Sequence, residues 1–119
     1  ENPQRGLPTV MAVVVLNDAE DGRALAVIEA SYITGIRTGA AGAIAAKYLS
    51  RENSETLGVG GAGQQAFFQI AAIAKVRKIK KILVYDSKEE NVAKLADSLK
   101  DLGIEIKKAS LEETAKTDI

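Results

Sequence analysis

The chain contains no cysteine, no histidine and no tryptophan. Without thiols and imidazoles it cannot form a disulfide, a Ser-His catalytic triad, a thiol nucleophile or most zinc and copper sites, so we expect no metal. The lack of cysteine fits a reducing compartment, and we expect a cytoplasmic protein. No apolar run approaches the roughly 18 residues of a membrane-spanning helix, so we expect no membrane partner.

Net charge is also lacking, because 16 basic residues balance 16 acidic ones, so nothing global attracts nucleic acid. The basic cluster at residues 77–81 could be a nucleic-acid patch, but no aromatic residue interleaves with it. We interpret it as cations at a helix end and expect no nucleic-acid partner. With 46% apolar residues in 119, the chain is one globular domain in size, too short for a complete dinucleotide fold plus a substrate domain.

The first half of the chain predicts a hairpin followed by an unusual helix. Apolar residues 10–16 and 24–29 predict two strands joined through the turn signal Asp21-Gly22. Ser31 is a candidate N-cap for a helix that ends near residue 49. That helix carries three glycines and many alanines, which suits close approach by another backbone or a ligand. Arg37 is the only charged residue of this helix before Lys47. It is either a residue whose charged end reaches solvent from a packed core helix or a residue of a ligand-binding site.

The second half predicts alternating strands and helices after a polar connector at residues 50–55. The expected elements are strands at 56–60, 82–86 and 104–108 and helices at 64–76, at 88–102 and after a Ser110/Glu113 capping box. Such alternation implies a parallel sheet with right-handed crossovers. We therefore predict an α/β fold: the first half of a Rossmann-type parallel sheet, at 51–119, preceded at 1–50 by a β-hairpin and a Gly/Ala-rich helix of a substrate or dimerisation domain.

The stretch LGVGGAGQQA, residues 57–66, matches the G-x-G-x-x-A variant of the dinucleotide fingerprint at Gly61, Gly63 and Ala66. A helix N-terminus offers free N–H donors and a positive dipole end to a pyrophosphate. Asp86 ends the next predicted strand, where a carboxylate binds ribose hydroxyls and repels a 2′-phosphate, so NAD is favoured over NADP; Lys88 weakens this preference. The alternative is a glycine-rich turn in a non-binding domain with a surface aspartate.

Three stretches together resemble the ornithine cyclodeaminase/μ-crystallin family. They are NPQRGLPTVMAVVVLND (2–18), GRALAVIEASYITGIRTGAAGAIAAKYLSRENS (22–54) and LGVGGAGQQAFFQ (57–69). The resemblance runs from Asn2 to Asp118, and the Ala/Gly-rich RTGAAGAIAAKYL is most similar to the alanine dehydrogenase branch. One departure is Gly60, where the family usually has an apolar residue.

The resemblance implies roles for particular residues. Thr9 would reach an NAD cofactor, and Arg37 would contact both the cofactor and the carboxylate of an amino-acid or imine substrate. Gln64 and Gln65 would contact the pyrophosphate, and Asp86 would be the acidic strand end. A planar guanidinium suits a carboxylate, which gives the Gly/Ala-rich helix a purpose.

The family's catalytic lysine and a substrate arginine lie upstream of the G-L-P-T loop, and its catalytic aspartate lies downstream of the matched region. We therefore expect a central fragment without catalytic residues of its own, inactive alone and holding at most the adenosine end of NAD. Its parent would be an alanine dehydrogenase-like oxidoreductase, or an ornithine cyclodeaminase or ketimine reductase. A non-catalytic cofactor-binding protein and a structural piece remain alternatives, and we expect a homo-oligomer, a dimer, because the apolar first strand needs cover.

Overall fold

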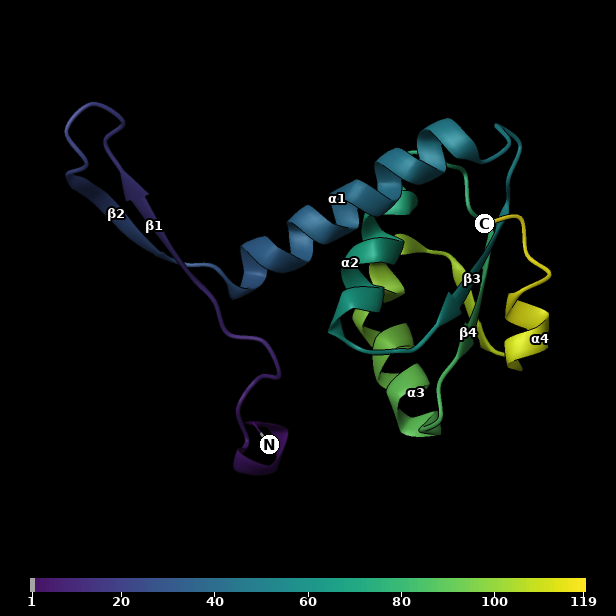
Figure 1. The fold of residues 1–119 in the computed structure, drawn as a ribbon. Helices are drawn as coiled ribbons and strands as arrows, with labels where there is room; N and C mark the ends of the chain where they lie inside the picture. Colours follow the sequence, from purple (N-terminus) through teal and green to yellow (C-terminus); the bar gives the residue numbers. More distant parts are fainter. Residues whose placement is uncertain (1) are drawn as a thin grey trace. The chain divides into compact units, whose positions relative to one another are not determined.

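The computed structural model describes residues 2–119. They divide into two compact units, of which the first ends at Gly35 and the second comprises Ile36–Ile119. The elements are drawn in Figure 1, in the order η1 Asn2–Arg5, β1 Val13–Asn17, β2 Ala24–Glu29, α1 Ser31–Leu49, β3 Thr56–Gly60, α2 Gln64–Ile73, β4 Lys81–Tyr85, α3 Glu89–Ser98, η2 Lys100–Leu102, β5 Glu105–Lys108 and α4 Leu111–Thr114.

The first unit contains the predicted hairpin. Strands β1 and β2 pair antiparallel with Val13 opposite Glu29, and the register shifts at Leu16/Asn17. Their connection closes through a hydrogen bond from the Asp18 amide to the Arg23 carbonyl (2.8 Å), with Gly22 in the left-handed region (φ 75°). The hairpin is confirmed, although β1 begins three residues later than predicted and the loop before it starts with a short 3-10 helix.

The predicted N-cap at Ser31 is wrong. Ser31 is the first residue of α1, and its hydroxyl accepts a hydrogen bond from the Ala12 amide (3.1 Å). The Ser31 amide instead donates to the Glu29 carboxylate (2.8 Å). Hydrogen bonds from the Ser31 side chain and backbone lower the pKa of Glu29. The anion at the positive end of α1 therefore comes from the end of β2.

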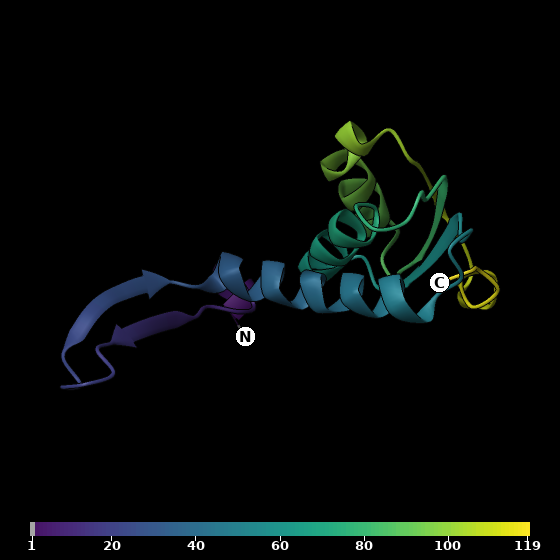
Figure 2. The ribbon, with the colours of Figure 1, turned by 90° about the horizontal axis from the view of Figure 1, so that it is seen from above.

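The second unit is built on a three-stranded parallel sheet of order β3-β4-β5, as the alternation predicts. Figures 1 and 2 show α2 and α3 on one face of this sheet and α4 on the other. The core lies between the sheet and helices α2 and α3, where Ile70, Ile82 and Val84 are fully buried. The helix predicted at 88–102 is split, because α3 ends at Ser98 and a 3-10 turn leads to Gly103, which takes the predicted left-handed stop (φ 65°). The Ser110/Glu113 capping box is confirmed.

The edge of β3 that faces away from β4 pairs with Ile119. The Ile119 amide donates to the Thr56 carbonyl (3.2 Å), and the Gly58 amide donates to the Ile119 carbonyl (2.8 Å), which is the hydrogen-bond pattern of parallel pairing at one residue. Strand β3 therefore has neighbours on both sides, β4 on one edge and the segment at Ile119 on the other.

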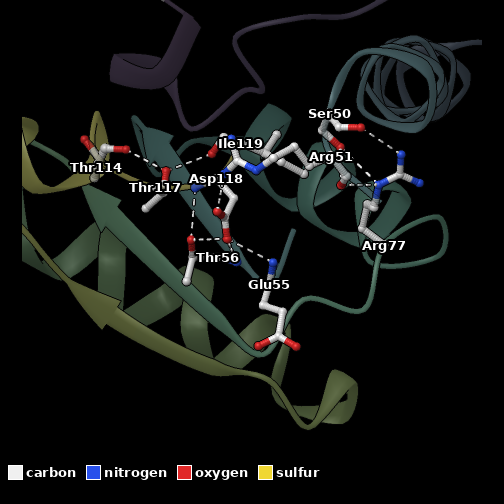
Figure 3. A network of polar contacts seen from close by, with 9 residues as sticks. All are labelled: Ser50, Arg51, Glu55, Thr56, Arg77, Thr114, Thr117, Asp118 and Ile119. Atoms are coloured by element: carbon white, nitrogen blue, oxygen red, sulfur yellow. Dashed lines mark hydrogen bonds and ion pairs between the residues drawn. The ribbon is translucent and has the colours of Figure 1, made fainter. Parts of the chain in front are cut away.

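A polar network fixes that segment at the amino end of β3 (Figure 3). The Asp118 carboxylate accepts hydrogen bonds from the Glu55 and Thr56 amides (both 3.0 Å), from the Thr56 hydroxyl (2.7 Å) and from Arg51 (2.6 Å). These donors, the Glu55 amide first, hold the pKa of Asp118 well below its usual range. Nearby, the Arg77 guanidinium donates to the carbonyls of Lys47, Ser50 and Arg51 at the end of α1. Arg77 of the basic cluster is thus a helix cap.

Candidate functional site

The turn between β3 and α2 contains the fingerprint glycines. Gly61 has φ +95°, a left-handed conformation that favours glycine. Gly63, the N-cap of α2, has φ −81° and ψ −175°, an extended conformation that any residue can adopt. A Cβ on Gly63 would meet no atom within 4 Å. Neither the backbone nor packing within the described chain requires glycine at position 63, so its backbone lies open to a ligand.

The N-terminus of α2 carries unused hydrogen-bond donors. The Ala66 amide donates to the Gly63 carbonyl (3.0 Å), but within residues 2–119 the amides of Gly63, Gln64 and Gln65 have no acceptor. The side chains of Gln64 and Gln65 are exposed, and the first turn holds no acidic residue. The positive end of the α2 dipole is therefore available to an anion. A pocket of about 240 Å³ adjoins this turn and reaches toward α3, lined by Ala62, Gly63, Gln64, Phe67, Lys94, Leu95 and Ser98.

Asp86 follows β4 and is hydrogen-bonded to the glycine turn. Its Oδ2 accepts from the Ala62 amide (2.7 Å), while the Gly61 amide donates to the Tyr85 carbonyl (2.7 Å). Its Oδ1 accepts from the Lys88 amide (2.8 Å) and from the Asn91 side chain (3.1 Å). The Ala62 amide, followed by the Lys88 amide, lowers the pKa of Asp86. The carboxylate is therefore ionised at neutral pH and fixes the turn to the neighbouring strand.

The sheet topology places this turn where open α/β sheets bind ligands. Ligands bind at the carboxyl ends of the strands, at the point where the strand order reverses. The chain crosses over at β3, because β4 and β5 extend from one edge of it and, after β5, Ile119 pairs with the other edge. Gly61, Gly63 and Asp86 all lie at the carboxyl ends of β3 and β4.

Helix α1 carries Arg37 and crosses α2 at a glycine. A Cβ on Gly39 would lie 2.5 Å from the Phe68 carbonyl oxygen, so the two helix backbones are in direct contact. The Gln69 side chain lies against Gly42 and donates to the Thr38 carbonyl (3.3 Å). The close approach predicted for the Gly/Ala-rich helix is thus made by a backbone. The Arg37 side chain is exposed, and within the described chain it forms no ion pair.

The structure therefore brings together five of the predicted site residues, Gly61, Gly63, Gln64, Gln65 and Asp86. Arg37 is in the same unit but not in contact with the turn in any hydrogen bond of the described residues. Thr9 is exposed at a bend in the first unit, so its role rests on the resemblance alone. Sequence reasoning missed Asn91, because an asparagine in the first turn of a helix carries no signal of its tertiary partner.

Comparison with known proteins places this geometry in a family. The ornithine cyclodeaminase/mu-crystallin family profile matches residues 1–119. The chain belongs to that family. Alanine dehydrogenase from Archaeoglobus fulgidus is 46% identical over 118 residues, which is 99% of this chain and 37% of the relative. Ornithine cyclodeaminase from Agrobacterium fabrum is 36% identical over 97% of this chain and 32% of the relative.

Solved structures of family members are similar in fold. The Δ1-pyrroline-2-carboxylate reductase of Thermococcus litoralis, in complex with NADH and L-proline, is 47% identical with a TM-score of 0.93. An archaeal alanine dehydrogenase dimer with bound NAD is 46% identical with a TM-score of 0.91. Each comparison covers 98% of this chain and 37% of the other. The chain thus spans little more than a third of the length of these family members. Within the part that the structure describes, no helix has the length and apolar character to cross a membrane.

Proposed function

We propose that residues 57–91 bind the adenosine and pyrophosphate end of NAD(H), as the first half of the nucleotide-binding domain of a longer oxidoreductase. The observation that carries the proposal is the pairing of Asp86 with the Ala62 amide (2.7 Å), which sets a ribose-binding carboxylate beside an anion-binding turn. The donor set fits the cofactor, because open amides suit the pyrophosphate and the open Gly63 Cβ position leaves room for it. The NAD and NADH complexes of family members support the assignment.

An NADH fluorescence titration of the 119-residue chain, with NADPH in parallel, tests this proposal. We expect NADH to bind more tightly than NADPH and Asp86→Ala to abolish the difference, because the carboxylate repels a 2′-phosphate. Asp97→Ala is the matched control, since Asp97 is an exposed acid at the far end of α3. The absence of NADH binding by the unaltered chain, with the far-UV spectrum of a folded protein, would contradict the proposal.

For the longer protein we propose hydride transfer at the α-carbon of an amino acid through its imine. Bound nicotinamide would supply or accept the hydride, and Arg37 of this chain would hold the substrate carboxylate through its planar guanidinium. The exposed guanidinium, without an acidic partner in the described chain, supports this role. An alanine dehydrogenase-like activity is the first choice, and cyclodeaminase or ketimine reductase activity the alternative. In the full-length protein, Arg37→Ala should raise KM for the amino acid or imine at least tenfold; unchanged kinetics would refute the role.

We also propose that residues 1–50 belong to a substrate and dimerisation domain and that the hairpin packs against a second copy. Its strands expose large apolar side chains, including Val13 (67%) and Val27 (72%), as the surface of an interface would. The alanine dehydrogenase dimer among the family members supports this assembly. Sedimentation velocity should give a concentration-dependent dimer that Val27→Glu converts to monomer. Leu111→Glu, an exposed apolar position on α4, is the control that should leave the dimer intact.

A further inference from the structure

The Asp86 carboxylate connects the end of β4 to the glycine turn and to the start of α3. Oδ2 holds the Ala62 amide in the glycine turn, and Oδ1 holds the Lys88 amide and the Asn91 side chain at the start of α3. A carboxylate has about four acceptor positions, two on each oxygen. Both positions on Oδ1 are occupied, so the acceptor position that remains belongs to Oδ2, the oxygen that already contacts the turn.

The Asn91 contact differs in kind from the two amide contacts. Backbone amides at 62 and 88 are set by the fold, whereas the Asn91 amide reaches Asp86 from a side chain five residues further along the chain (3.1 Å). The backbone amide of Asn91 is satisfied separately by the Lys88 carbonyl (3.1 Å). The helix therefore does not need the Asn91 side chain, and the contact serves the carboxylate.

We propose that Asn91 is a positioning residue of the nucleotide site: it fixes the Asp86 carboxylate so that Oδ2 receives a ribose hydroxyl while it still holds the Ala62 amide. This inference rests on the proposed cofactor function. Fixing an acceptor before binding lowers the ordering cost of the complex. Asn91 thereby contributes to the preference for a free 2′-hydroxyl over a 2′-phosphate without touching the cofactor.

The test compares Asn91→Ala with the unaltered chain and with Asp97→Ala. Hydrogen exchange of the Ala62 amide, measured by NMR without cofactor, reports directly on the hold of Asp86 on the turn. NADH and NADPH titrations report on the site. We expect Asn91→Ala to speed Ala62 exchange severalfold and to weaken NADH binding about fivefold with little effect on NADPH. Asn91→Ala loses the hydrogen bond to Asp86 but gains helix propensity, because alanine favours helix more than asparagine does. The two effects offset each other, so the urea midpoint should barely change.

Unchanged Ala62 exchange in Asn91→Ala would overturn the inference. So would an unchanged ratio of NADH to NADPH affinity in a protein that binds NADH. If the unaltered chain binds neither cofactor, the proposed function fails, and the Ala62 exchange rate alone still decides whether Asn91 positions Asp86. Asp97→Ala should match the unaltered chain in Ala62 exchange and in both cofactor titrations, which separates loss of the Asn91 contact from a general effect of substitution in α3.

Discussion

Gly39→Ala and Gly42→Ala, two identical changes one turn apart on α1, should differ in their consequences for stability. An alanine Cβ at position 39 would lie 2.5 Å from the Phe68 carbonyl oxygen and 2.8 Å from its carbon. Ordinary contact distances are about 3.5 Å or more, so α1 and α2 would have to separate by about 1 Å. Because the obstacle is backbone within a helix, it cannot rotate away. Overpacking of this kind costs about 1–3 kcal/mol.

At position 42 the new Cβ would instead meet the amide end of Gln69, which can swing away. The loss there is the hydrogen bond to the Thr38 carbonyl, about 1 kcal/mol. Both variants gain about 1 kcal/mol from the higher helix propensity of alanine. Gly42→Ala should therefore be close to neutral, and Gly39→Ala should be about 1 kcal/mol less stable than Gly42→Ala, the middle of the range that these costs and gains give.

Urea denaturation followed by circular dichroism at 222 nm measures the difference in the free energy of unfolding. The result that would refute the reasoning is a Gly39→Ala chain as stable as Gly42→Ala, since the two helix backbones would then not be in contact at residue 39. In the full-length protein, separation of the helices would also displace Arg37, which precedes Gly39 by two residues. The same variant should then weaken substrate binding as well as stability.

Three further changes test the second unit. Gly61→Ala should lower the free energy of unfolding by about 1–2 kcal/mol in urea titrations, because φ is +95° there; a neutral effect would contradict that conformation. Ser110→Ala should cost about 1 kcal/mol by the same measurement, since it removes the capping box, while Ser98→Ala should cost less because Ser98 caps no N-terminus. The depressed pKa of Asp118 means that its hydrogen bonds stabilise the fold fully above the unfolded pKa of about 4, and that this contribution is lost as pH falls toward the folded pKa. Urea midpoints from pH 7 to pH 3 should therefore fall less steeply in Asp118→Asn, and parallel profiles would rule this out.

The parts of the fold that depend on neighbours in sequence were predictable. The apolar run that forms β3, the left-handed stop at Gly103 and the Ser110/Glu113 capping box can each be recognised within a few consecutive residues. The nucleotide-type turn is local in the same sense, because the spacing of Gly61 and Gly63 between a strand and a helix is a property of one short segment. Asp86 could be predicted because a strand-helix-strand unit brings the carboxyl end of the next strand beside the glycine turn at a regular spacing along the sequence.

Only the tertiary structure decided which residues serve those local elements. The Asp118 carboxylate closes onto Thr56 across 62 residues, and Arg77 caps α1 from 30 residues away rather than presenting a basic surface. Ser31 lies within α1 instead of preceding it, and its hydroxyl serves the Ala12 amide, 19 residues away. Local patterns record backbone preference and apolar periodicity. The partner of a polar side chain depends on which distant backbone the folded chain brings within about 3 Å, and no spacing in the sequence encodes that.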